Sequence, residues 1–268
     1  MNITQNIGIR ICGTGSSVPT RTVTNDDMAT IVETSDEWIS TRTGISERHF
    51  ADQETNLSLG TEAAEKAIAM AGIPREEIGV VICATITPDN IVPSQACLLQ
   101  KSLGLTEQIF AFDICAACTG FLYAMHTARS LLCTMPEKKY ALVVASELLS
   151  RVTNFADRNT CVLFGDGAGA AVITLDENSR YAFDCGADGN TEVLYCPKSY
   201  HNTNPFACIS ARKQPEQQVK MEGRAVYSFA VQALSGSIRR VADQVGGYPE
   251  HYICHQANAR ISRRQPSS

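Results

Sequence analysis

The 268-residue sequence contains no apolar run that approaches the ~20 residues needed to span a membrane. Its first six residues lack a basic region followed by an apolar block, so no export signal is predicted. An excess of basic residues is also missing, because 23 Lys and Arg stand against 28 Asp and Glu, a formal net charge of −5. These absences argue against a membrane protein, an exported protein and a nucleic-acid binder, and we expect a cytoplasmic protein.

The chain also lacks any regular spacing among its eleven cysteines. An odd number without a repeated spacing does not describe a disulfide framework, and the pairs Cys115/Cys118 and Cys254/His255 lack the second half of a zinc signature. No metal ligands are therefore predicted. The glycine-rich residues 13–19 lack the third glycine of a dinucleotide-binding fingerprint, and we interpret them as a turn.

Apolar periodicity along the chain switches repeatedly between the strand and helix patterns, which is typical of an α/β protein. Residues 186–218 show no sustained period and predict an irregular region over or beside the active site. Strands are expected at residues 7–11, 80–85, 109–115, 140–145 and 162–174, of which 80–85 and 140–145 are buried, and helices at 59–71, 121–132 and 223–245.

The last of these helices is expected to bury one face. Its apolar residues recur at three- and four-residue steps: Val226, Phe229, Ala230, Ala233, Leu234, Ile238 and Val241. A short strand at 252–254 is then expected to deliver His255 at its carboxyl end, where open α/β sheets place their chemistry. Taken alone, a histidine after an apolar triplet is more often structural.

Cys118 carries the most specific chemical signal. An alternating apolar strand runs into small residues and then into a helical pattern, so Cys118 lies on a strand-to-helix turn. Free N–H groups and the positive end of the helix dipole favour a thiolate there, which predicts a thiol pKa below its usual ~8.5. The same N–H groups could hold an oxyanion. The residues alone also allow a buried core cysteine, which packs as a small hydrophobe.

Three further motifs accompany residues 112–121, and they occur in a fixed order along the chain. They are residues 38–48 (WISTRTGISER), 164–171 (FGDGAGAA) and 255–261 (HQANARI). Together the four motifs resemble the β-ketoacyl-acyl carrier protein synthase III family, the condensing enzymes that start fatty acid synthesis. The resemblance runs from about residue 7 to residue 261. It implies the thiolase-like fold, an α/β fold of two similar halves packed in five layers, with residues 1–174 and 175–268 as the two halves.

The resemblance also implies a role for each matched residue. Cys118 would attack the thioester of an acyl-coenzyme A, and His255 would donate hydrogen bonds to the thioester carbonyl of malonyl-acyl carrier protein as carbon dioxide leaves. Trp38, Arg42 and Arg158 would hold the adenine nucleotide of coenzyme A. The carrier-protein docking segment would be Gln256, Ala257, Asn258, Ala259 and Arg260, with Arg260 as its main charge.

Partners and specificity follow from the same resemblance. Val92 matches a position that lines the partner subunit's acyl pocket in a homodimer and is often aromatic, so its small size predicts a primer longer or more branched than acetyl. No cofactor is expected, since the coenzyme A thioester is a substrate. Residues from Lys220 onward carry a net charge of +4, against −9 elsewhere, which suits an acidic carrier protein, although clustered arginines are also common on solvated helices.

The sequence departs from the family after Ile261. The family continues through core strands that bring a catalytic asparagine and an oxyanion-hole glycine, and residues 262–268 match neither. We therefore expect the second half to be incomplete and condensation to be weak. Two alternatives stay open: another condensing enzyme, such as a type III polyketide synthase or a hydroxymethylglutaryl-coenzyme A synthase, and a truncated, non-catalytic homologue that binds acyl-coenzyme A.

Overall fold

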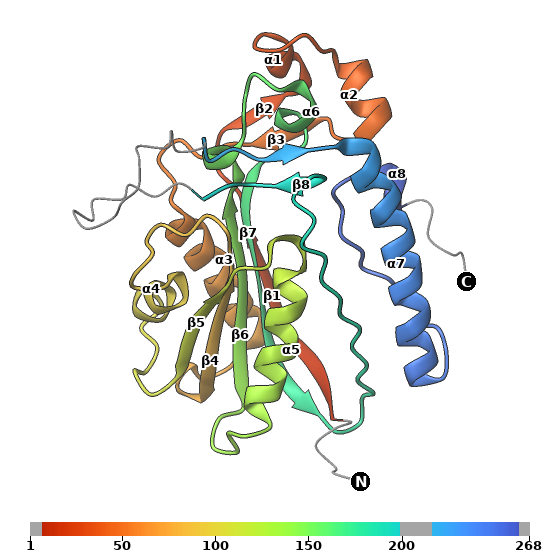
Figure 1. Cartoon of the computed structure of the whole chain (residues 1–268). Helices are drawn as coiled ribbons and strands as arrows, with labels where there is room; N and C mark the ends of the chain where they lie inside the picture. Colours follow the sequence, from red (N-terminus) through yellow and green to blue (C-terminus); the bar gives the residue numbers. More distant parts are fainter. Residues whose placement is uncertain (1–6, 199–215, 263–268) are drawn as a thin grey trace, which may run out of the picture.

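A five-stranded mixed sheet forms the centre of the molecule, in the order β1-β7-β6-β4-β5 (Figure 1). The computed structural model describes residues 7–198 and 216–262. Strand β4 runs parallel to both β5 and β6, whereas β7 is antiparallel to β6 and β1, so β1 and β5 are the edges. The strands are β1 (Gly8–Ser17), β4 (Ile78–Ala84), β5 (Phe110–Ile114), β6 (Tyr140–Leu148) and β7 (Asp166–Asp176).

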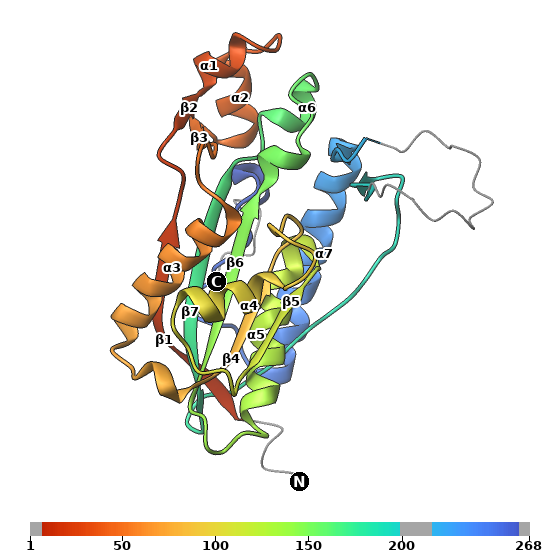
Figure 2. The same ribbon diagram turned by 90° about the vertical axis from the view of Figure 1, so that its left-hand side faces the viewer.

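Helices cover both faces of this sheet (Figure 2). The helices α3 (Asn56–Ala71) and α4 (Gln95–Ser102) pack on one face, and α5 (Gly120–Leu132) packs on the other. Successive side chains of a strand point to opposite faces, so Val81 and Cys83 join the cluster under α3 and α4. Val80 and Ile82 join the cluster under α5. Every residue of β4 is therefore buried, as the continuous apolar run predicts.

A small subdomain caps the end of the sheet at which β6 finishes and β7 begins (Figure 1). Its apolar centre contains Met28, Ile39, Cys161 and Val162, all 1% exposed or less. It consists of α1 (Asn25–Ala29), α2 (Asp36–Thr43), α6 (Arg158–Cys161) and the antiparallel pair β2 (Thr22–Thr24) and β3 (Glu47–His49).

After β7 the chain runs as an extended segment, residues 180–190, that lies between α5 and α7 (Figure 1). Tyr181 hydrogen-bonds His126 of α5, while Asp184 pairs with Arg240 of α7. The remaining regular elements are β8 (Leu194–Tyr195), β9 (Lys220–Met221), α7 (Gly223–Val245) and α8 (Ala259–Ser262), with the short 3-10 helices η2 (Arg75–Glu77), η3 (Ala117–Thr119) and η4 (Leu149–Val152). No helix within the described ranges is both long and apolar enough to cross a membrane.

Residues 13–17 continue strand β1, so the predicted turn at 13–19 is wrong over most of its length. The glycines serve a close approach of helix α3 instead. A Cβ added at Gly13 would lie 2.3 Å from the carbonyl oxygen of Ala67, and one at Gly15 would lie 2.1 Å from that of Ala63. Glycine is therefore needed here because a helix backbone occupies the space of a side chain.

Helix α7 has the predicted bounds, but its expected buried face is wrong. None of the seven residues expected on that face is fully buried: six are half-buried and Phe229 is 61% exposed, and within α7 only Ala242 is buried. The physical reason is that α7 packs against the extended segment and α8 rather than on the five-stranded sheet.

The expected strand at 252–254 is also absent, because no strand in the described part of the chain pairs with these residues. Ile253 is 96% exposed. Strand β7 ends at Asp176, two residues beyond the boundary at 174/175, and the division of the chain into two similar halves stays a prediction.

Candidate active site

Cys118 lies where β5 gives way to α5, as the sequence predicts. The preceding Ala117 has a φ of +43°, in the left-handed region that a residue with a Cβ adopts only at a cost. The following Gly120 lets the turn approach β4, since a Cβ there would lie 3.1 Å from that of Ala84. A strained, tightly packed turn of this kind is often found at functional sites.

The thiol pKa of Cys118 differs from the sequence-based expectation. Cys118 is an exposed residue, yet the protein atoms around its thiol withhold water from the thiolate, and this desolvation raises its pKa. The residue's own backbone N–H lowers the pKa, and the charge of Glu147 raises it. The predicted lowering by the helix N-terminus is therefore wrong, because desolvation dominates at this turn.

Glu147, near the end of β6, is a site residue that the sequence reasoning missed. Burial raises the pKa of its carboxyl group, while hydrogen bonds from Thr87 and from the Ile86 N–H lower it. The Ile86 N–H donates to Glu147 Oε1 over 2.8 Å. A single acidic residue near the end of an otherwise apolar strand was the available signal. The charge of Glu147 is one of the causes that raise the pKa of the Cys118 thiol.

Trp38, Arg42 and Arg158 come together, as predicted. The guanidinium carbons of Arg42 and Arg158 each lie 4.6 Å from the centre of the Trp38 ring, within cation–π range. Arg42 reaches the ring from the same helix, four residues on, and Arg158 from α6. The Arg158 Nη1 also donates to the Glu33 carbonyl over 2.8 Å. A flat ring with two cations suits a nucleotide that carries phosphates.

His255 lies in a stretch without regular structure, before α8. The residue is exposed, yet desolvation lowers the pKa of its imidazole, which favours the neutral form. Within residues 7–198 and 216–262, no hydrogen bond joins His255 to Cys118. In the described part of the chain, the two groups are therefore not linked by a hydrogen bond.

The predicted docking segment lies beside the helix that carries Trp38. Gly44 ends α2 with a φ of +79°, and a Cβ added there would lie 2.7 Å from the Cβ of Ala259. The Asn258 side chain accepts the Arg260 N–H over 2.9 Å at the start of α8. The Arg260 guanidinium lies 5.8 Å from the Tyr227 ring centre on α7. Gln256 and Ala257 are exposed. The sequence reasoning did not predict this contact between α2 and α8.

Asp166, in the glycine-rich motif, is a second residue that the sequence reasoning missed. Only 5% of it is exposed, and its carboxylate accepts the Ser150 N–H over 2.9 Å and the Ala51 N–H over 2.8 Å. Gly165 packs closely as predicted, since a Cβ would lie 3.2 Å from that of Arg48. Gly169 has open space instead. The motif thus ties η4 to the chain after β3.

Val92 lies at the tip of the loop between β4 and α4 and is 83% exposed.

Ten cysteines in the described ranges are free. The same ranges contain no group of three or more His, Cys, Asp or Glu side chains that could hold a metal ion.

Comparison with known proteins identifies the family. The family described as 3-oxoacyl-[acyl-carrier-protein (ACP)] synthase III matches residues 112–189. The β-ketoacyl-[acyl-carrier-protein] synthase III of Clostridium acetobutylicum is 44% identical over 258 residues, which cover 94% of this chain and 78% of the relative. That of Natranaerobius thermophilus is 43% identical over 261 residues, with the same two shares. This chain belongs to the β-ketoacyl-acyl carrier protein synthase III family.

Solved structures agree with this assignment. The 3-oxoacyl-(acyl carrier protein) synthase III of Pseudomonas aeruginosa PAO1 superposes with a TM-score of 0.83 at 36% identity, covering 96% of this chain and 78% of that one. The priming β-ketosynthase of the R1128 polyketide pathway gives 0.83 at 30% identity, covering 97% and 77%. The predicted thiolase-like fold is confirmed. The chain therefore belongs to a family of condensing enzymes of the acyltransferase type.

Proposed function

We propose that Cys118 is the nucleophile that takes the acyl primer from coenzyme A. Its thiol gives up a proton and its sulfur attacks the thioester carbonyl, and the resulting oxyanion expels coenzyme A thiolate, which takes the proton. The single observation that carries this proposal is the position of Cys118 on a strained turn at the start of α5. Because the pKa of the thiol is raised, the proton leaves during the attack on the thioester rather than before it.

The coenzyme A would be held at the small subdomain. The Trp38 ring offers a stacking surface for the adenine, and Arg42 and Arg158 offer positive charge for its phosphates. In the free protein the two guanidinium groups lie against the ring, so an incoming base would replace one of these cation–π contacts.

The second half-reaction would use His255. Its lowered pKa supports a neutral imidazole, which donates one N–H to the malonyl thioester carbonyl. As carbon dioxide leaves, the enolate attacks the acyl thioester on Cys118, a carbon–carbon bond forms, and the Cys118 thiolate is released. Residues 256–260 would receive the carrier protein, with Arg260 exposed toward its acidic surface.

We propose a homodimer in which Val92 of one subunit lines the acyl pocket of the other. Val92 is 83% exposed in the single chain, which leaves its side chain free to be covered by a second subunit. A valine leaves more room than an aromatic residue, so the primer would be longer or more branched than acetyl. The chain would work in the cytoplasm, with no cofactor beyond its coenzyme A substrate.

Mass spectrometry of the protein after incubation with acetyl-, butyryl- and isobutyryl-coenzyme A tests this function. We expect one acyl group per chain, on the peptide that contains Cys118, with butyryl or isobutyryl preferred in competition. Cys118→Ala should abolish the label and Cys115→Ala, three residues earlier, should keep it. A label on Cys115 with Cys118 unmodified would overturn the assignment. Binding of acyl-coenzyme A without any acylation would favour the non-catalytic alternative.

A further inference from the structure

The loop between β4 and α4, residues 85–94, combines an exposed apolar tip with a buried base. Ile91 and Val92 at the tip are 73% and 83% exposed. Thr85 and Thr87 at the base are each 5% exposed, and Gln95, directly after the loop, is fully buried. A surface loop normally needs few anchors, so the polar contacts that hold this base call for an explanation.

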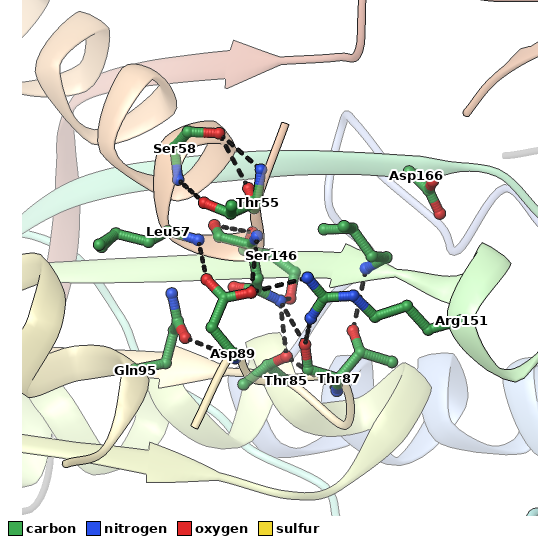
Figure 3. A network of polar contacts seen from close by, with 12 residues as sticks. Thr55, Leu57, Ser58, Thr85, Thr87, Asp89, Gln95, Ser146, Arg151 and Asp166 are labelled. Carbon is green, nitrogen blue, oxygen red and sulfur yellow. Dashed lines mark hydrogen bonds and ion pairs between the residues drawn. The ribbon is translucent and has the colours of Figure 1, made fainter. Parts of the chain in front are cut away.

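Asp89 and Arg151 form the charged part of the base (Figure 3). The Asp89 carboxylate accepts the Leu57 N–H over 2.8 Å and the Asn56 N–H over 3.2 Å, at the start of α3. It also accepts Arg151 Nη2 over 2.8 Å. Burial alone would raise the pKa of Asp89, but these donors outweigh it and lower the pKa, so the pair is ionic. The Arg151 Nη1 donates to the Thr87 carbonyl over 3.2 Å.

Uncharged contacts fix the two ends of the same loop. The Asn56 side chain donates to the Thr87 carbonyl over 3.0 Å and to the Ser146 carbonyl over 2.8 Å, which links the loop to α3 and β6. The Asp89 N–H donates to Gln95 Oε1 over 3.1 Å, which closes the loop across its tip. Residues 90–93 between these anchors are exposed, so the place of the tip depends on the base.

We propose that Asp89 and Arg151 are positioning residues that set the primer preference by holding the tip of this loop. Neither touches the acyl group. Their ion pair fixes where Val92 stands relative to the end of the sheet, and so how much room the acyl chain finds. This inference rests on the proposed function, in which Val92 lines the acyl pocket. A small displacement of Val92 is enough to change the primer preference, because one methylene group more or less in an apolar pocket changes the rate ratio between substrates roughly 10- to 200-fold.

The test compares Arg151→Ala with a matched control, Arg75→Ala. The Arg75 side chain has the same 38% exposure, and it pairs with Glu65 over 2.6 Å near the opposite end of β4. The measured quantity is the rate of Cys118 acylation by butyryl-coenzyme A divided by that by acetyl-coenzyme A. We expect Arg151→Ala to change this ratio by about threefold or more, Arg151→Lys to restore part of it, and Arg75→Ala to leave it unchanged.

Val92→Phe separates failure of the inference from failure of the proposed function. An unlabelled wild-type chain overturns the proposed function, and a Val92→Phe chain with an unchanged ratio overturns the role of Val92 and this inference with it. If Val92→Phe shifts the ratio but Arg151→Ala does not, the inference alone is overturned. The inference alone is also overturned if Arg75→Ala shifts the ratio as much as Arg151→Ala does. If Arg151→Ala does not fold, the near-isosteric Asp89→Asn serves, and an unchanged ratio there again overturns the inference.

Discussion

The sheet region and the α7 region contain similarly apolar residues but use them differently. Helices cover both faces of the sheet, so every residue of β4 is buried. In α7 only Ala242 is buried, although the apolar stripe is as regular as that of any core helix. A pattern reports which side chains are apolar, and burial depends on what the rest of the chain places against them.

Polar contacts join α7 to the extended segment after β7. The Arg240 guanidinium pairs with the Asp184 carboxylate over 2.7 Å, and Arg180 donates to the Val245 carbonyl. Regions with few buried apolar contacts open at a lower free energy than buried strands. We therefore expect α7 to be the less stable of the two regions, and four predictions test this comparison and the candidate active site.

The largest expected difference is in the free energy of unfolding, between a leucine-to-alanine variant in the sheet and one in α7. Leu142 of β6 is fully buried, whereas Leu234 of α7 is half-buried. Leu142→Ala removes buried contacts and leaves a cavity, and should lower the free energy of unfolding by about 2–5 kcal/mol. Leu234→Ala should lower it by about 1 kcal/mol or less, because water already reaches that side chain. Urea denaturation followed by circular dichroism measures both, and equal losses would contradict the comparison.

Gly15→Ala should have the next largest effect. The added Cβ would lie 2.1 Å from the Ala63 carbonyl oxygen, so α3 must move away from β1. We expect a loss of about 1–3 kcal/mol in unfolding free energy. Gly169 in the neighbouring strand β7 is the control, since nothing lies within 4 Å of a Cβ added there. A Gly169→Ala variant destabilised as strongly as Gly15→Ala would show that strand glycines matter for another reason.

These glycines also show where prediction from sequence stops. A glycine needed for close packing and a glycine needed for a turn look alike in one dimension, and the turn was predicted where a strand exists. Trp38 and Arg42 could be placed together because four residues on a helix return to the same face. Asp89 and Arg151 are 62 residues apart, and no local pattern joins them.

Prediction of the site's chemistry from the sequence met the same limit. The position of Cys118 followed from the local change from strand to helix, but its pKa depends on how closely the rest of the chain surrounds the thiol. Glu147 comes from β6, so only the assembled sheet brings it near the thiol. The strand predicted at 252–254 failed because a strand requires a paired neighbour, which local periodicity does not provide.

The alkylation of Cys118 should reveal the influence of Glu147. Because desolvation and then the Glu147 charge raise the thiol pKa, the rate with iodoacetamide should keep rising with pH beyond the ordinary titration range of a cysteine. Glu147→Gln removes the negative charge and should move the midpoint to lower pH. The exposed Glu137 is the control, and Glu137→Gln should leave the midpoint in place. A midpoint unmoved by Glu147→Gln would mean that the carboxylate does not act on the thiol.

The smallest effect is expected from Asp184→Asn, which removes the ion pair between α7 and the extended segment. The hydrogen bond from Arg240 is the main reason that the pKa of Asp184 falls to about 2. A lowered carboxyl pKa stabilises the folded chain above the ordinary pKa of about 3.8, and that contribution shrinks as the pH falls toward 2. The difference in unfolding free energy between wild type and variant should therefore be constant from pH 7 to pH 5 and smaller at pH 3. Because the Arg240 side chain is 59% exposed, salt should weaken the pair, and a difference insensitive to both pH and salt would show that Asp184 holds α7 by packing rather than by charge.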